Sequence, residues 1–193
     1  SGTTGSLDDI ISSAKTTVAT SLGIQADNID KDYLKAKDPT SLSAAAQVTS
    51  VLNVVSSTAG GSNSSNDALD SFAELLTDSS GSVDLTSTTA MTSIIEKAAE
   101  KAGTLSDISA NISNVASITT NVITSIKAID TTSSDVSTFS ALEAQAHASK
   151  LVAETIEASG AQVSINLTDT IESANSSVIV DNIFEPTQAE KGI

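Results

Sequence analysis

The sequence predicts an all-α fold, an antiparallel up-and-down bundle of about five to six helices with a short extended segment at its C-terminal end. Three observations predict this fold. Apolar residues recur at helical spacing along most of the chain, helix-capping residues and glycines delimit these stretches, and short polar connections separate them. We therefore expect a helical bundle domain over residues 1–160 and an extended segment or linker over residues 161–193.

The first helix is expected over residues 7–22. Ser6 can cap its first turn, and Asp8 lies where the positive end of the helix dipole favours an acidic side chain. Gly23, followed by an apolar residue, is typical of a Schellman motif and ends the helix. The apolar stripe that we expect to face the core consists of Leu7, Ile10, Ile11, Ala14, Val18 and Leu22.

The elements that follow are predicted from the same signals. Residues 27–37 are expected to form one or two helical turns, which Pro39 ends, before a second helix over residues 41–57. Residues 58–66 are rich in Gly, Ser and Asn, which indicates a flexible loop. A third helix is expected over residues 67–76, with Leu69 among its core residues.

Three more helices are expected in the second half of the chain. A fourth helix over residues 87–102 ends at Gly103 and carries lysines near its C-terminal end. The longest helix is expected over residues 105–129, where apolar residues alternate steps of four and three, as in the central helix of a bundle. A sixth helix over residues 134–159 ends at Gly160.

The composition excludes two classes of partner. The chain carries 24 acidic and 9 basic side chains, so its formal net charge is −15, and it contains no Arg. Nucleic-acid phosphates and anionic membrane surfaces are bound by basic side chains, so we expect neither partner. No apolar stretch approaches the length of about 18 residues that spans a membrane, and we expect no membrane insertion. Repulsion between acidic copies favours a monomer.

We find no catalytic motif and expect that the protein is not an enzyme. His147, the sole His, follows Glu143 by four residues, but both lie on a polar helix face, for which a solvated salt-bridge surface is the simpler interpretation than a metal site. Ser12 and Lys15 match the S-x-x-K spacing of penicillin-recognising serine enzymes. The S-D-N motif of those enzymes is missing, and the run at residues 101–103 that loosely matches K-T-G ends a helix.

The densest cluster of oxygen ligands consists of Asp27, Asn28, Asp30 and Asp32. Calcium is a hard cation that accepts such ligands, and weak calcium sites occur in extracellular modules. The loop glycine and the terminal Glu of an EF-hand are missing, so the alternative is a solvent-exposed polar turn. These four residues form our calcium-site hypothesis, and we expect no other cofactor.

Three segments resemble a known kind of module. They are the helix Ala14–Ile24 with Thr16-Thr17 and a final Leu22-Gly23, the acidic stretch Asp27–Tyr33, and the Ala-rich start of the next helix, Ala44–Val48. Their order resembles the helical modules inserted among the cadherin-like and calcium-binding repeats of very large bacterial surface and biofilm adhesins. Val51-Leu52-Asn53 and Val83-Asp84-Leu85-Thr86 fit the same pattern, and the resemblance covers about residues 7–130. It implies a helical module without catalytic residues.

Two functions follow as hypotheses. The first is a non-catalytic extracellular module of a bacterial surface protein, which serves adhesion and biofilm formation as a spacer or as a binding platform for a peptide, a glycan or a neighbouring protein module. Its 58 Ser and Thr residues, its lack of Cys and its negative charge suit a protein outside the cell. The alternative is a self-assembling helical filament subunit, flagellin-like or secretion-needle-like, which would leave long apolar stripes exposed in the monomer.

Overall fold

The computed structural model describes residues 6–33, 35–78 and 82–159, and within these ranges the regular elements are helical. In chain order they are α1 (Leu7–Leu22), the 3₁₀ turn η1 (Ala26–Asn28), α2 (Pro39–Ala59), α3 (Ser64–Asp78), α4 (Thr88–Ala102), α5 (Leu105–Ile108), α6 (Ile112–Lys127) and α7 (Val136–Ser159). The predicted all-α bundle is confirmed. The extended segment expected over residues 161–193 lies outside the described residues.

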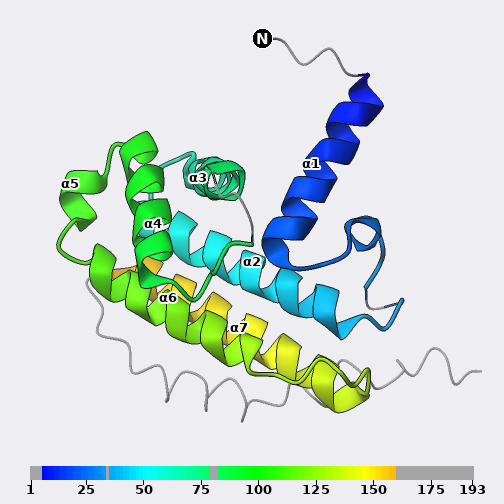
Figure 1. Cartoon of the computed structure of the whole chain (residues 1–193). Helices are drawn as coiled ribbons and strands as arrows, with labels where there is room; N and C mark the ends of the chain where they lie inside the picture. The colour runs from blue at the N-terminus through cyan, green and yellow to red at the C-terminus, as the bar shows by residue number, and fades with distance from the viewer. Residues whose placement is uncertain (1–5, 34, 79–81, 160–193) are drawn as a thin grey trace, which may run out of the picture.

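Three long helices form the body of the bundle. α2, α6 and α7 lie side by side, with α6 running opposite to the other two (Figure 1). The most extensive contact between any two described helices joins α2 and α7. α3 and α4 pack against each other and cross one end of this layer, where α4 contacts both α2 and α6.

The core combines large aliphatic side chains with many small ones. The largest fully buried side chains are Val51, Val54, Val55, Met91, Ile94, Ile95, Val115, Val122, Ile123, Ile126, Leu142 and Ile156. On α2 and α7, small residues are buried beside them: Ser43, Ala44, Ala46, Ser50, Ala148, Ser149 and Ala153. The distance between packed helices depends on the side chains at their contact, so small residues allow α2 and α7 to approach closely.

Most helix ends follow the predicted capping signals. Ser6 and Asp9 form a capping box at the start of α1, and Gly23 ends the helix in the left-handed conformation with φ 68°. Gly103 ends α4 in the same way, with φ 75°. These two positions need glycine because a side chain would strain a backbone with positive φ.

Two predicted boundaries around α2 are wrong. Pro39 begins α2 instead of ending the preceding segment, because Asp38 caps the helix and proline suits a first turn, where its missing N–H would have no partner. In the described residues of the segment before it, the regular element is the 3₁₀ turn η1. At the other end, α2 continues to Ala59 and α3 begins at Ser64, so the loop expected over residues 58–66 is reduced to residues 60–63.

The long helix expected over residues 105–129 is divided into α5 and α6. Between them, the Asn111 N–H donates to the Ile108 carbonyl at 2.8 Å, and Ser109 Oγ donates to the Ser106 carbonyl at 3.3 Å. Ser and Asn have low helix propensity because their side chains compete for nearby backbone groups. The apolar period continues across this break, which is why the periodicity alone did not reveal it.

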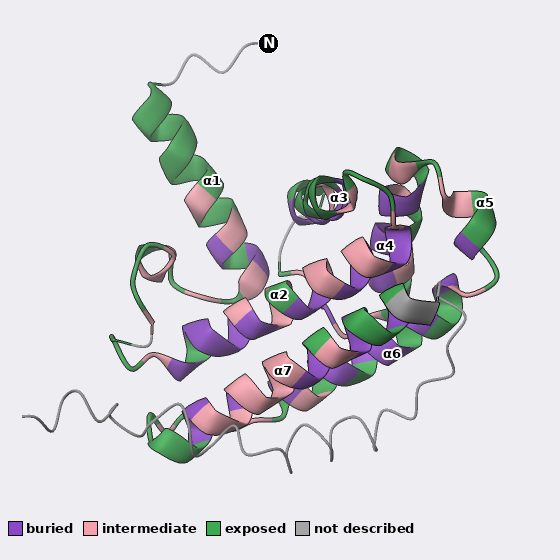
Figure 2. Ribbon diagram, turned by 180° about the vertical axis from the view of Figure 1, so that it is seen from behind, coloured by how far each residue is buried: buried purple, intermediate pink, exposed green. Residues whose placement is uncertain are grey.

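α1 projects from the bundle, and its free end is exposed to solvent (Figure 2). Only its last two turns contact the core, through Val18, Ala19, Ser21 and Leu22. Leu7, Ile10 and Ile11 are 71%, 45% and 44% exposed. The expectation that the whole stripe faces the core is therefore wrong for the first two turns, because the bundle reaches only the C-terminal end of this helix.

Candidate functional site

The first candidate site is the acidic segment between α1 and α2, in which Asn28, Asp30 and Asp32 already have protein partners. Asn28 Nδ2 donates to Asp38 Oδ2 at 2.8 Å, and Asn28 Oδ1 accepts from Lys31 Nζ at 2.9 Å. Asp38 in turn caps α2 by accepting from the Ser41 N–H at 3.1 Å. Burial alone would raise the pKa of Asp38, but the hydrogen bonds from Ser41 outweigh it and lower the pKa.

The three aspartates of this segment do not converge. Asp30 forms an ion pair with Lys15 of α1, and Asp32 Oδ1 accepts from the Lys35 N–H at 3.0 Å. Asp27 is exposed. Across the described residues, no group of three or more His, Cys, Asp or Glu side chains is placed to hold a metal ion. The segment is therefore fixed by bonds within the protein, and the calcium-site hypothesis requires a bound ion to displace some of them.

The second candidate is the pair of Glu143 and His147 on α7. We expected both on a solvated face, but the structure partly buries them. Glu143 and His147 are half-buried, and burial raises the pKa of the Glu143 carboxyl by desolvation. His147 Nδ1 is buried without a hydrogen-bond partner among the described residues. The exposed ion pair of this helix lies farther along, where Lys150 Nζ is 3.6 Å from Glu154 Oε1.

Of the two residues that match serine-enzyme spacing, Lys15 is already paired with an acidic side chain. Lys15 binds Asp30 across the gap between α1 and the acidic segment, and the Ser12 carbonyl accepts from Thr16 Oγ1 at 2.9 Å. Residues 101–103 end α4, as the sequence predicted. The K-T-G-like run therefore lies on a helix end, whereas the enzyme motif requires a strand.

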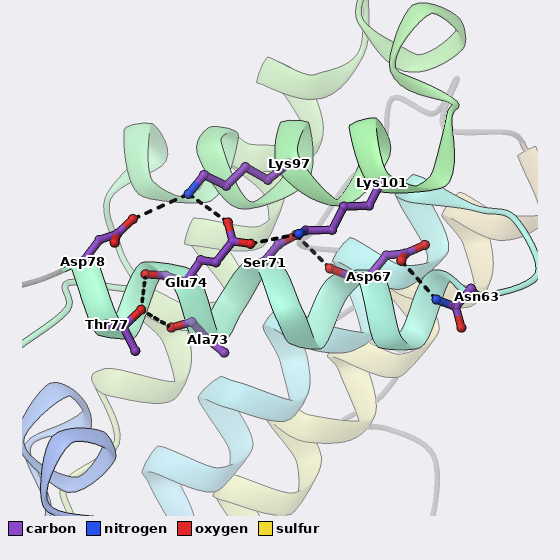
Figure 3. Close-up of polar contacts among 9 residues, drawn as sticks. All are labelled: Asn63, Asp67, Ser71, Ala73, Glu74, Thr77, Asp78, Lys97 and Lys101. Carbon is purple, nitrogen blue, oxygen red and sulfur yellow. Dashed lines mark hydrogen bonds and ion pairs between the residues drawn. The ribbon is translucent and has the colours of Figure 1, made fainter. Parts of the chain in front are cut away.

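A cluster of ion pairs joins α3 to α4 (Figure 3). Lys97 Nζ lies 3.2 Å from Glu74 Oε2 and 3.7 Å from Asp78 Oδ2, and Lys101 Nζ lies 2.8 Å from Glu74 Oε1. The hydrogen bonds from Lys101 and Lys97 hold the pKa of Glu74 below its ordinary value, and the bond to Glu74 raises the pKa of Lys101. The sequence analysis missed this cluster, although the shared four-residue spacing of the two lysines and the two acids was a usable signal.

Other carboxylates hold turns and helix ends. Asp84 Oδ1 accepts from the Thr86 N–H at 3.1 Å and from Thr86 Oγ1 at 2.6 Å, and Asp130 binds Thr132 in the same way at 2.9 and 2.7 Å. Asp135 caps the first turn of α7. These hydroxyl and backbone bonds favour the charged form and lower the pKa of all three carboxyl groups.

A groove lies between α2, α3 and α7. One part has a volume of about 510 Å³ and is lined by Leu52 and Leu69 together with the amides of Asn53 and Asn66. It continues into a second part of about 620 Å³, and both parts include Glu157. Leu69 is 52% exposed in this groove, although the sequence predicted it in the core. The groove offers amide, hydroxyl and carboxylate groups to a polar ligand.

Comparison of the chain with protein-family models, with curated proteins and with solved structures finds no match. Among the described helices, none is long and apolar enough to cross a membrane. The chemistry of the residues themselves therefore has to support any functional conclusion.

We expect calcium to leave the melting temperature unchanged, because a bound ion would have to displace Lys15 from Asp30 and Lys31 from Asn28. The measurement is thermal unfolding in about 5 mM CaCl₂, above the range in which weak extracellular sites are filled, with MgCl₂ at the same concentration as the control. A stabilisation by calcium alone that is lost in Asp27→Asn would contradict this expectation and support the calcium site.

The ion pairs of Glu74 predict part of the acid sensitivity of the fold. Because the pKa of Glu74 is lowered in the folded protein, its contribution is present above the pKa of the unfolded chain and is lost as the pH falls through the folded pKa. Glu74→Gln should therefore reduce the fall in unfolding free energy between about pH 6 and pH 3, measured by urea denaturation.

The matched control is Glu96→Gln, which removes the same charge from an exposed position of α4. It should retain the acid sensitivity of the unchanged protein. An equal effect of the two substitutions would show that general charge, and not the pairing between α3 and α4, sets the response.

Proposed function

We propose that this chain is a non-catalytic extracellular module of a bacterial surface adhesin, acting as a spacer or binding platform in adhesion and biofilm formation. The observation that carries the proposal is that its carboxylates maintain the fold: Asp38 and Asp135 cap helices, Asp84 and Asp130 hold turns, and Glu74 joins two helices. These hydrogen bonds and ion pairs lower the pKa of the carboxyl groups, which are therefore charged at neutral pH and hold the helices and turns together.

The exposed hydroxyl groups support the same role. Thr16 Oγ1 donates to the Ser12 carbonyl at 2.9 Å, and Ser125 Oγ donates to the Asn121 carbonyl at 3.0 Å. Hydroxyl groups that are hydrogen-bonded within their own helix keep the surface hydrophilic although it carries few basic side chains. With a net charge of −15, such a surface keeps modules apart and soluble, and salt outside the cell screens the repulsion within each module.

The segments that resemble adhesin modules occupy defined places in the fold, which adds support. The helix with the Thr-Thr pair is α1, which ends at its Leu-Gly cap. The acidic stretch forms the connection after α1 and is held by the ion pair between Lys15 and Asp30. The Ala-rich stretch lies in the first half of α2, where several residues are buried. In a binding platform, the groove between α2, α3 and α7 would be the place for a peptide or glycan.

The exposed stripe of α1 favours the second candidate, a self-assembling helical subunit. Leu7, Ile10 and Ile11 form an apolar face that the described part of the chain leaves open to solvent, as the filament hypothesis requires. The other long helices bury their stripes in the bundle, which favours the surface module.

We expect an antibody raised against the recombinant chain to label intact, unpermeabilised cells of the bacterium that carries it. A cytoplasmic protein detected only after permeabilisation serves as the control. Labelling of the chain only after permeabilisation would contradict an extracellular module. Electron microscopy of the labelled cells distinguishes the two candidates, since regularly decorated filaments would support the subunit.

A further inference from the structure

The first two turns of α1 present an apolar face with the spacing of a coiled-coil seam. Leu7, Ile11, Ala14 and Val18 follow one another in steps of four, three and four, and Ile10 flanks them. Leu7, Ile10 and Ile11 are exposed to 71%, 45% and 44%, and Ala14 is also exposed. Large aliphatic side chains grouped in this way on a projecting helix mark a contact surface.

The helix that carries this face is held firmly at its other end. The Val83 N–H donates to the Ser21 carbonyl at 2.9 Å, and Ser21 Oγ donates to the Leu76 carbonyl at 3.5 Å. Ala19 and Ser21 are buried, and Lys15 is paired with Asp30 of the following segment. α1 is therefore an anchored arm, and the described residues leave its first two turns uncovered.

We propose that this face pairs with the same face of a second copy of the chain, with the two α1 helices antiparallel. The seam then centres on two layers in which Ile11 of each copy packs beside Ala14 of the other, and Leu7 reaches toward the part of Val18 that the core of the other copy leaves exposed. The contact is two-fold symmetric, so it closes on itself and yields a dimer instead of a filament. The pairing does not depend on a role in adhesion, because it rests on α1 alone.

Charge selects the second copy and the antiparallel direction. Asp8 and Lys15 are one heptad apart on the same edge of the seam, so an antiparallel partner brings Asp8 of each copy to Lys15 of the other. Lys15 already binds Asp30, and the partner's carboxylate joins this pair. A parallel arrangement would place the acidic first turns together and the two bundles, each of net charge −15, side by side.

The size of the face indicates weak association. A stable interface buries at least about 1,000 Å² in total, whereas three or four exposed aliphatic side chains from each copy supply only a part of that area. Repulsion between copies of net charge −15 favours the monomer, so we expect a reversible dimer whose population rises with protein concentration. Salt weakens the two Asp8–Lys15 pairs but also screens this repulsion.

Sedimentation equilibrium of the full chain, from about 10 μM to about 1 mM, tests the pairing. The unchanged protein should shift from monomer toward dimer. Ile11→Asp should stay monomeric over the same range. Ser13→Asp, which adds the same charge at an exposed position about a third of a turn from the seam, should dimerise like the unchanged protein. Circular dichroism should show equal helix content in all three.

Disulfide trapping tests the direction, since the chain has no Cys of its own. An equimolar mixture of Ile11→Cys and Ala14→Cys proteins should cross-link with each other faster than Ala14→Cys does with itself. Faster self-linking of Ala14→Cys would indicate parallel helices and overturn the antiparallel pairing.

Three further results would overturn the proposal. One is a dimer that Ile11→Asp leaves intact, because another surface would then join the copies. The second is open-ended polymers, which would favour the filament subunit. The third is a monomer at the highest concentration: slow reaction of Ile11→Cys with a thiol reagent would then mean that the chain covers its own stripe, and fast reaction would leave the face to a different protein.

Discussion

The fold depends on small side chains between its helices, and on where the hydroxyls among them form hydrogen bonds. Ser50 Oγ donates to the Ala46 carbonyl and Thr119 Oγ1 to the Val115 carbonyl, both at 2.7 Å within their own helices. A hydroxyl bonded one turn back leaves no buried donor unpaired, so it can occupy a core position without a partner across the interface. Ser149 is an exception, since its buried Oγ has no partner among the described residues.

This constraint explains how a chain with only 2% aromatic residues builds a bundle and where its charges lie. Close contact between α2 and α7 compensates for the small area that each Ala or Ser buries. Polar groups outside the core also stabilise the fold, because they cap helices, hold turns and form the ion pairs of Glu74 with two lysines. The apolar half of α1 lies beyond this body, and the pattern of inward stripes fails there, as it also does at Leu69 of α3.

Local signals predicted what depends on local physics. The capping signals at Ser6, Gly23 and Gly103 predicted these helix ends correctly, because capping bonds join residues close in the sequence. The break between α5 and α6 was missed because the apolar period continues across it. The exposure of Leu7 was missed because periodicity shows that a helix face is apolar but does not show what covers it. The calcium hypothesis rested on residue types alone, and the partners of Asn28 and Asp30 depend on residues that the fold brings from α1 and the start of α2.

The most direct test of this account is the unfolding free energy of two substitutions at Ser50, which is 1% exposed in α2. Ser50→Ala removes only a hydroxyl bonded within its own helix, and we predict a change below about 1 kcal/mol. Ser50→Leu inserts bulk where small residues are packed, and we predict a loss of about 1–3 kcal/mol. A large loss in Ser50→Ala with none in Ser50→Leu would contradict the claim that small, locally bonded side chains set the packing of the bundle.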